Sequence, residues 1–258
     1  MGVSNKKQAR PGINSAHRVF DIIELLFETG GMTTSEIADE LDLANSTVHE
    51  YLKTCEQREY VRKKPDGTYI LSLKFLDIGE VVRQLNPVYK TAKKPLSRIA
   101  NKTGEVAWLY TEEHGYAVPL DAKRGQQGVQ VLGRIGNRKP MHHISAGKAM
   151  LAEMPRERVE SILEKHSLRG ATENTITDRE TLFETLETIQ QQGHAFNDGE
   201  EVEGIRAVGM AIVTNDNIQA ALSVSGPSNR VQGERFREEL PEILSGAVNE
   251  IELKLTYE

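Results

Sequence analysis

The sequence is poor in the residues that build disulfide-linked, metal-cluster or membrane proteins. It contains one cysteine, Cys55, among 258 residues, which excludes an internal disulfide and a cysteine-based metal cluster. It has no run of about eighteen apolar residues, so we expect no transmembrane helix. The first ten residues are polar and lack the apolar core of a signal peptide, so we expect a cytoplasmic protein. Length and composition are those of a globular protein with one large domain or two smaller ones.

Basic residues are fewer than acidic ones, and a formal net charge of −6 disfavours a nucleic-acid partner. The charges are segregated, however. Residues 1–18 hold bases and no acid, residues 19–43 hold acids and no base, and residues 44–64 are mainly basic. A DNA-binding face can therefore use the first and third blocks, although segregated charge is also common on solvated surfaces.

The N-terminal quarter shows three short helical patterns. Apolar spacing predicts a helix over residues 15–29, with Ser15 as its cap and a Gly-Gly pair at its end. Thr33 and Glu36 form the pattern of a capping box, which predicts the start of a second helix. Asn45 is expected to cap a third helix. The inner face of this helix carries Val48, Leu52 and Cys55.

A basic segment, an Asp-Gly turn and an apolar segment follow the third helix. Residues 61–64 and 68–71 flank this turn, which predicts a β-hairpin. Two helices joined by a tight turn and followed by a basic hairpin are the layout of a winged helix-turn-helix. Residues 73–85 are then helical in pattern as far as Asn86-Pro87. We interpret them as a linker helix that takes part in dimer contacts.

Strand and helix patterns alternate in the C-terminal two thirds. Strands are predicted over residues 105–111, 116–122 and 128–133, helices over 145–153, 155–166 and 178–192, an antiparallel hairpin over 206–225, and a last helix over 233–255. Their interleaving predicts an α+β sensor domain. The predicted organisation is a DNA-binding domain at 1–72, a linker helix at 73–87 and an effector-binding domain at 88–258.

Several blocks, in order along nearly the whole chain, resemble the IclR family of bacterial and archaeal regulators. They are residues 15–19, 34–38, 45–49, 69–71, 103–105, 141–142, 145–152 (Ser-Ala-Gly-Lys-Ala-Met-Leu-Ala), 172–178, 193–195, 200–201, 204–206 and 221–227 (Ala-Leu-Ser-Val-Ser-Gly-Pro). The resemblance implies a GAF-like antiparallel α/β effector-binding domain and a homodimer or dimer of dimers. It also implies control of genes for the use of small organic acids, sugars or aromatic compounds.

Two positions depart from the family pattern. Glu50 stands in the predicted recognition helix where the family usually has a basic residue, which indicates unusual base contacts or an unusual operator. Residues 207–212 lack the cysteine that the family pocket often carries, so the resemblance does not carry over a ligand. The amino-acid composition of the acid-rich C-terminal half resembles that of haloarchaeal proteins.

The candidate DNA-binding residues lie mainly in the third helix and the hairpin. A recognition helix places its N-terminal turn in the major groove, where short polar side chains reach base edges or phosphates. Basic residues of the wing supply salt-dependent affinity that is largely independent of base sequence. The alternative interpretation of the wing residues is a solvated turn. The alternative interpretation of Asn45 is a helix cap. The candidates are Arg18, Asn45, Ser46, Thr47, His49, Lys53, Arg62, Lys63 and Lys64.

The candidate effector residues come from a helix start, a strand and flanking positions. Residues 145–148 open a helix, whose N–H groups and dipole suit a carboxylate or phosphate. This is not a Walker A loop, because His142 and Ala149 replace its first glycine and its Ser/Thr. Ser223 and Ser225 share one face of a strand, which lines the pocket in the family; ordinary strand serines are the alternative. The candidates are Trp108, Leu132, Ser145, Ala146, Gly147, Asn197, Asp198, Ser223 and Ser225. Core packing is the alternative interpretation of Trp108 and Leu132.

The residues present in the chain decide between a metalloprotein, an enzyme and a DNA-binding regulator. Adjacent histidines in a strand point to opposite faces, so His142-His143 with His194 predicts no metal site, and we expect no cofactor. A GAF-like enzyme is disfavoured, because no catalytic order of nucleophile, base and acid stands out. We expect a ligand-responsive regulator that binds double-stranded DNA and a small organic or sugar acid. A protein-interaction module with a vestigial winged helix is the alternative.

Overall fold

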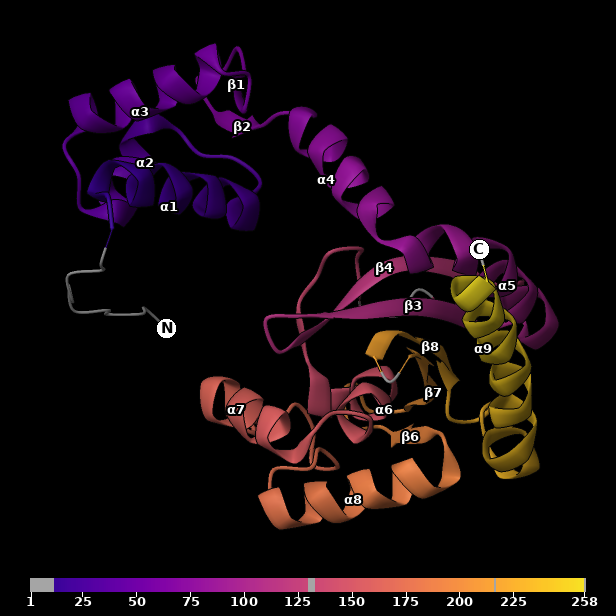
Figure 1. Ribbon diagram of the computed structural model, residues 1–258. Helices are drawn as coiled ribbons and strands as arrows, with labels where there is room; N and C mark the ends of the chain where they lie inside the picture. Colours follow the sequence, from indigo (N-terminus) through magenta and orange to yellow (C-terminus); the bar gives the residue numbers. More distant parts are fainter. Residues whose placement is uncertain (1–11, 130–132, 216, 258) are drawn as a thin grey trace. The chain divides into compact units, whose positions relative to one another are not determined.

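The computed structural model describes residues 12–129, 133–215 and 217–257, and the chain divides into two compact units between Val82 and Arg83 (Figure 1). In these ranges no helix combines the length and the apolarity needed to cross a bilayer. The division falls inside a helix, α4, rather than in a loop.

The first unit is a winged helix-turn-helix, as predicted. Its elements are α1 (Asn14–Thr29), α2 (Thr34–Leu41), α3 (Asn45–Gln57), β1 (Val61–Lys63), β2 (Tyr69–Leu71) and most of α4 (Lys74–Leu85). One apolar cluster joins the three helices to the antiparallel hairpin, and Ile22, Ile37, Leu52 and Val61 are among its fully buried members. The hairpin joins this core, with β2 in contact with α1 and β1 in contact with α3.

Two helix boundaries in this unit confirm the sequence interpretation. The Thr33 side chain accepts a hydrogen bond from the Glu36 N–H, and the Glu36 carboxylate accepts one from the Thr33 N–H at 2.7 Å, which completes the capping box. Gly30 ends α1 in the left-handed region, at φ 77°, where a residue without Cβ is least strained.

Two predicted caps are wrong. Ser15 lies inside the first turn of α1, and the cap position is Ile13, which offers no side-chain hydrogen bond. Asn45 is likewise the first helical residue of α3, after Ala44. A cap needs extended backbone, and in both helices a preceding residue adopts it, so each polar residue is drawn into the helix.

The second unit is built on a six-stranded antiparallel sheet. Its strands are β3 (Val106–Glu113), β4 (Tyr116–Arg124), β5 (Lys139–Pro140), β6 (Ala195–Asp198), β7 (Ile205–Thr214) and β8 (Asn217–Pro227). They lie in the order β5-β4-β3-β8-β7-β6, so the two shortest strands form the two edges. The hairpin of β7 and β8 is the one predicted from the sequence.

Helices cover both faces of this sheet (Figure 1). One layer holds α5 (Pro87–Thr103) and α9 (Leu240–Tyr257), and the other holds α6 (Ser145–Ala152), α7 (Arg156–His166) and α8 (Arg179–Gln192). Alternate residues of each central strand enter the two cores; Leu109 faces α5 and α9, whereas Trp108 faces α6. The α+β class predicted for this domain is confirmed.

Three parts of the second unit differ from the sequence interpretation. The sequence pattern does not predict helix α5, because Asn86-Pro87 is typical of an interruption; in the structure Asn86 caps the new helix by accepting from the Val88 N–H at 3.0 Å. Residues 128, 129 and 133 are not in a strand, and the rest of the predicted strand 128–133 lies outside the described residues. The edge strands β5 and β6 are too short to produce a strand pattern.

Candidate functional site

The first candidate site is the exposed face of α3. Val48, Leu52 and Cys55 bury the opposite face of this helix in the core of the first unit. The exposed face carries the predicted residues Asn45, Ser46, Thr47, His49 and Lys53. Because Asn45 caps nothing, its amide belongs to this polar surface. Short donors and acceptors along one helical turn are the groups that reach base edges in a major groove.

The β1–β2 hairpin adds positive charge to the first unit. Arg62 and Lys63 are exposed and Lys64 is half-buried, and the Lys63 ammonium lies 5.3 Å from the centre of the Tyr69 ring. Arg18, on α1, lies 3.7 Å from the carboxylate of Asp21. Part of the Arg18 charge is therefore neutralised within the protein, which weakens it as a phosphate ligand.

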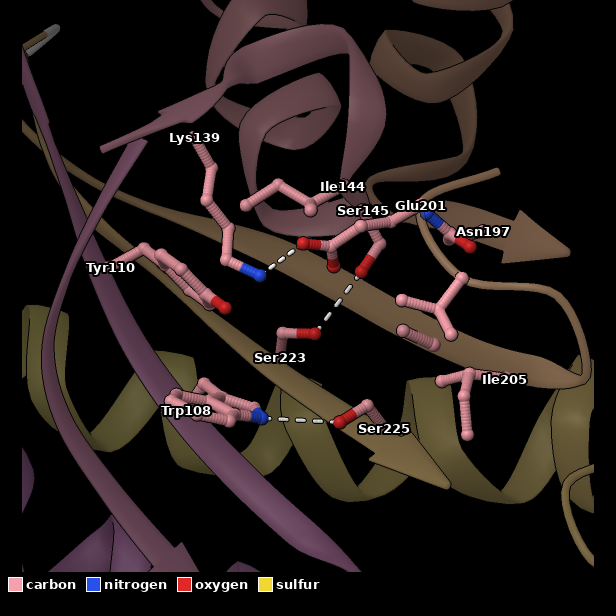
Figure 2. Close-up of a pocket in the computed structure, with 12 residues that line it drawn as sticks. Trp108, Tyr110, Lys139, Ile144, Ser145, Asn197, Glu201, Ile205, Ser223 and Ser225 are labelled. Carbon is pink, nitrogen blue, oxygen red and sulfur yellow. Dashed lines mark hydrogen bonds and ion pairs between the residues drawn. The ribbon is translucent and has the colours of Figure 1, made fainter. Parts of the chain in front are cut away.

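The second candidate site is a small cavity between the sheet and the start of α6 (Figure 2). Its volume is about 30 Å³, room for a few waters at most. The lining residues come from five strands, the start of α6 and the turn after β6. They are Trp108, Tyr110, Lys139, Ile144, Ser145, Asn197, Glu201, Val202, Ile205, Ala207, Ser223 and Ser225.

Strand register brings the polar groups of the cavity together. Trp108 of β3 is the direct neighbour of Ser223 of β8, and alternation places Ser225 on the same face. The Trp108 Nε1–H donates to Ser225 Oγ at 3.1 Å, and the Ser223 and Ser145 hydroxyls lie 3.1 Å apart (Figure 2). Each hydroxyl has one O–H donor and two lone pairs, so the Ser225 O–H and one O–H of the Ser145–Ser223 pair are not used by these contacts.

A glycine on β7 permits this arrangement. Gly209 is the cross-strand neighbour of Ser223, and a Cβ there would lie 2.5 Å from the backbone nitrogen of Ala146. No side chain fits in that space. The first turn of α6 therefore rests directly on the sheet, which brings Ser145 within reach of Ser223.

Two ion pairs lie beside each other at this end of the domain. The Lys148 ammonium contacts both Glu200 oxygens at 2.5 Å, and both side chains are largely buried. Burial lowers the pKa of Lys148 and raises that of Glu200, and the attraction between the two opposes both shifts. Next to this pair, Lys139 contacts Glu201 inside the cavity. Burial, and then Glu201, raise the pKa of Tyr110 well above its usual value, which keeps that phenol neutral.

The cavity gathers five of the nine predicted effector residues: Trp108, Ser145, Asn197, Ser223 and Ser225. Ala146 and Gly147 are buried behind it, with Gly147 against the Met141 carbonyl. Asp198 is on the other side of β6, where Arg206 binds its carboxylate at 2.6 Å. Leu132 lies outside the described residues.

Sequence reasoning missed the charged pair of this cavity. Lys139 and Glu201 are 62 positions apart and belong to no common pattern, so only the sheet topology brings them together. Residues 200–201 were part of the family resemblance, but Lys139 carried no signal of its own.

The predicted strand geometry of His142 and His143 is wrong. His142 and His143 lie in a 3₁₀ turn (Met141–His143), not in a strand, and both rings contact the Arg169 carbonyl oxygen, at 3.0 and 2.7 Å. In a tight turn neighbouring side chains are not forced to opposite faces. Within the described ranges, no group of three or more His, Cys, Asp or Glu side chains has the arrangement of a metal site.

Comparison with known proteins assigns both units. The family described as bacterial transcriptional regulator IclR C-terminal matches residues 80–253, and the IclR helix-turn-helix domain matches residues 15–65. The chain belongs to the IclR family. This IclR-family protein is therefore a transcriptional regulator with a DNA-binding and an effector-binding domain, and not an enzyme.

Individual relatives agree with this family. The probable HTH-type transcriptional regulator ArcR of Halobacterium salinarum is 31% identical over 247 residues, 94% of each chain. The crystal structure of IclR from Thermotoga maritima has a TM-score of 0.80 at 28% identity and covers 95% of this chain and 100% of that one. An IclR homologue from Microbacterium hydrocarbonoxydans complexed with 4-hydroxybenzoate has a TM-score of 0.79 at 24% identity, covering 93% and 98%.

Proposed function

We propose that this regulator responds to a small organic acid or sugar acid, which binds in the cavity behind α6, and that it controls genes for the use of such compounds. The observation that carries the proposal is the convergence of Lys139 with the hydroxyls of Ser145, Ser223 and Ser225 on one cavity. An ammonium group and several hydroxyls are complementary to a carboxylate that also bears hydroxyl groups.

We further propose that α3 reads base edges in the major groove and that the wing binds phosphates. The exposed polar turn of α3 and the adjacent basic hairpin support this assignment. An effector then acts by binding more tightly to one conformation of the regulator than to another, which shifts their populations and so the affinity for DNA.

The wing is tested by replacing Arg62, Lys63 and Lys64 with alanine. We expect weaker binding to all DNA sequences alike and a flatter dependence of log K on log salt, with the slope falling by up to about three units because three phosphate contacts are lost. A matched control replaces the three exposed α5 lysines, Lys90, Lys93 and Lys94, which removes the same charge from the other unit. Equal loss in both variants would mean that net charge, not the wing, sets the affinity.

The effector proposal is tested by a thermal-shift screen of small organic acids, sugar acids, neutral sugars and aromatic acids, with and without the promoter DNA of the regulator. The aromatic set includes 4-hydroxybenzoate, which an IclR homologue of the same fold binds. We expect at least one acid to raise the melting temperature and to change the affinity for DNA. A response to neutral sugars alone would contradict the acid class.

A further inference from the structure

Tyr110 contributes to the cavity a buried hydroxyl group that the proposed function does not use. It lies on β3, two residues after Trp108, and the centres of the two rings are 5.9 Å apart. Its direct cross-strand neighbours are Pro119 of β4 and Ala221 of β8. Neither neighbour has a polar side chain, so the residues paired with Tyr110 offer its hydroxyl no side-chain partner.

The Tyr110 hydroxyl faces the cavity. Only 5% of the residue is exposed, and Figure 2 shows the phenol oxygen pointing into the space between the sheet and α6. In the described part of the chain, no group forms a hydrogen bond with this oxygen. The fully enclosed side-chain atoms without a partner are Asp121 Oδ2 and Arg235 Nε, so the Tyr110 oxygen borders the open volume of the cavity.

This hydroxyl is an uncharged hydrogen-bond donor. Burial, and then the Glu201 carboxylate, raise the pKa of Tyr110 above its usual value, so the phenol keeps its proton. Buried polar groups are nearly always hydrogen-bonded, and an unpaired one reduces stability. An acceptor atom on a ligand would supply the missing partner.

The cavity can widen without moving Tyr110. Its volume of about 30 Å³ holds a few waters at most, so an acid must displace part of the wall. Glu201 and Val202 line the cavity from the turn between Gly199 and Gly204, which belongs to no strand or helix. Movement of residues 201–203 breaks no strand pairing, whereas Tyr110 is held between β4 and β8. The phenol therefore stays in place as a fixed donor.

We propose that Tyr110 is a specificity-determining residue whose hydroxyl donates a hydrogen bond to an uncharged oxygen of the effector, a hydroxyl or carbonyl oxygen carried in addition to the carboxylate. This inference rests on the proposed function and narrows the class of acid. The negative charge of Glu201 acts on Tyr110, so it repels a carboxylate placed against the phenol but not an uncharged oxygen. An acid without that oxygen leaves the donor unpaired and binds less tightly.

The test compares pairs of acids that differ by one hydroxyl group. Trp108 is the only tryptophan of the sequence and lines the cavity, so its fluorescence reports binding there directly. The probes are lactate with propionate, and 4-hydroxybenzoate with benzoate, titrated into the full-length protein. For at least one pair, we expect the hydroxyl-bearing acid to bind about tenfold more tightly, the effect of one buried hydrogen bond that the analogue cannot form.

Tyr110→Phe removes the hydroxyl and keeps the ring. We expect Y110F to bind both acids of that pair equally, because only the hydroxyl-bearing acid loses affinity. Tyr89→Phe removes the hydroxyl of a buried tyrosine in the core on the other face of the sheet, and it should leave the tenfold difference unchanged. Equal loss for both acids in Y110F, or a preference that survives in Y110F, would overturn the inference.

The stability of the free protein provides a second measurement that needs no ligand. Because the Tyr110 hydroxyl bonds to no described residue, Y110F should melt at the same temperature as the wild-type protein or higher. A fall of about 2–4 °C is expected where a protein hydrogen bond is lost from a domain of this size. Such a fall would assign the hydroxyl a structural role and overturn the inference.

Operator binding, measured in parallel, separates this inference from the proposed function. If the wild-type protein responds to an acid and Y110F discriminates between that acid and its analogue equally well, the specificity step is wrong and the function stands. If Y110F loses the preference but no acid changes operator binding, Tyr110 recognises a ligand and the proposed effector control is wrong. If no acid changes the Trp108 fluorescence or the melting temperature, both are wrong.

Discussion

Glu50 is the exposed acidic residue near the start of α3, and we expect it to affect the choice of operator. Its side chain is 72% exposed and its carboxylate lies 3.7 Å from the His49 ring. A carboxylate in the major groove repels phosphates but accepts a hydrogen bond from the amino group of cytosine. We expect Glu50→Ala to lose a preference for cytosine at one position of each half-site, about 1–3 kcal/mol, and to bind non-specific DNA more tightly. Selection from a random DNA library measures both effects, and an unchanged base preference would show that Glu50 points away from the bases.

His142 makes the stability of the second unit dependent on pH. Its ring is 3% exposed, and burial, aided by the nearby His143 and Lys148, lowers its pKa to about 4 despite the Arg169 carbonyl. An unfolded chain with an ordinary histidine pKa of about 6.5 binds the proton first. We therefore expect the contribution of this histidine to the stability to be complete above about pH 6.5 and to decline by about 3 kcal/mol as the pH falls to 4.

Urea unfolding at pH 7 and at pH 4.5 checks this prediction. His142→Gln should flatten the pH dependence of the free energy of unfolding. Parallel curves for the wild-type protein and H142Q would refute the assignment.

At the residue scale, the sequence predicted what depends on local geometry. Alternation along one strand was sufficient to place Ser223 and Ser225 on a common face, and the cavity contains both. The Lys139–Glu201 pair depends on which strands become edges and on the curl of the sheet, and neither is encoded in a short window. Arg206 was not foreseen as the partner of Asp198, for a similar reason: the pairing of β6 with β7 sets it.

Two helical glycines should respond in opposite ways to alanine. A methyl group on Gly246 of α9 would contact nothing within 4 Å, whereas one on Gly147 of α6 would lie 2.1 Å from the Met141 carbonyl oxygen. We expect Gly246→Ala to stabilise the protein by about 0.5–1 kcal/mol, through restricted freedom of the unfolded chain. Gly147→Ala should destabilise it strongly, because backbone must move. Chemical denaturation measures both, and a stabilising G147A would contradict the close contact.

Helix α4 carries an uncovered apolar stripe. Ile78, Val81, Val82 and Leu85 follow one face at helical spacing and are 40, 55, 59 and 76% exposed. Such a stripe is typical of a contact between copies of a chain. We expect Val81→Glu to shift the protein towards monomer in light scattering and to weaken operator binding. Gln84→Glu, which adds the same charge beside the stripe, should leave the oligomeric state unchanged; dissociation of both variants would indicate a general charge effect.

Helices and strands were predictable where they are long and amphipathic. The helices of the first unit and the β7–β8 hairpin have a clear period, and the sequence located them. Helix α5 was missed because Asn86-Pro87 ends one helix and begins the next, and the same two residues suit both roles. The two-residue strand β5 has no period at all, and its identity as a strand comes from pairing with β4.

As a whole molecule, the protein should unfold in two steps. The division at residues 82 and 83 leaves each unit with its own core. We therefore expect a fragment that begins at Asn86, the cap of α5, to fold without the winged helix. Circular dichroism and a cooperative thermal transition would confirm it. In scanning calorimetry of the full chain, an effector acid should raise the midpoint temperature of only the transition that the fragment retains. A uniform shift of all midpoint temperatures would show that the units do not unfold separately.

The strand order of the effector domain limits how copies of the protein associate. The long strands β4, β3, β8 and β7 are interior, and the two edges are β5, with two residues that include Pro140, and β6, with four. A proline has no N–H to offer a neighbouring chain, and short rims give poor templates for intermolecular strand addition. We therefore expect the edge strands β5 and β6 to resist strand addition by a second copy of the domain.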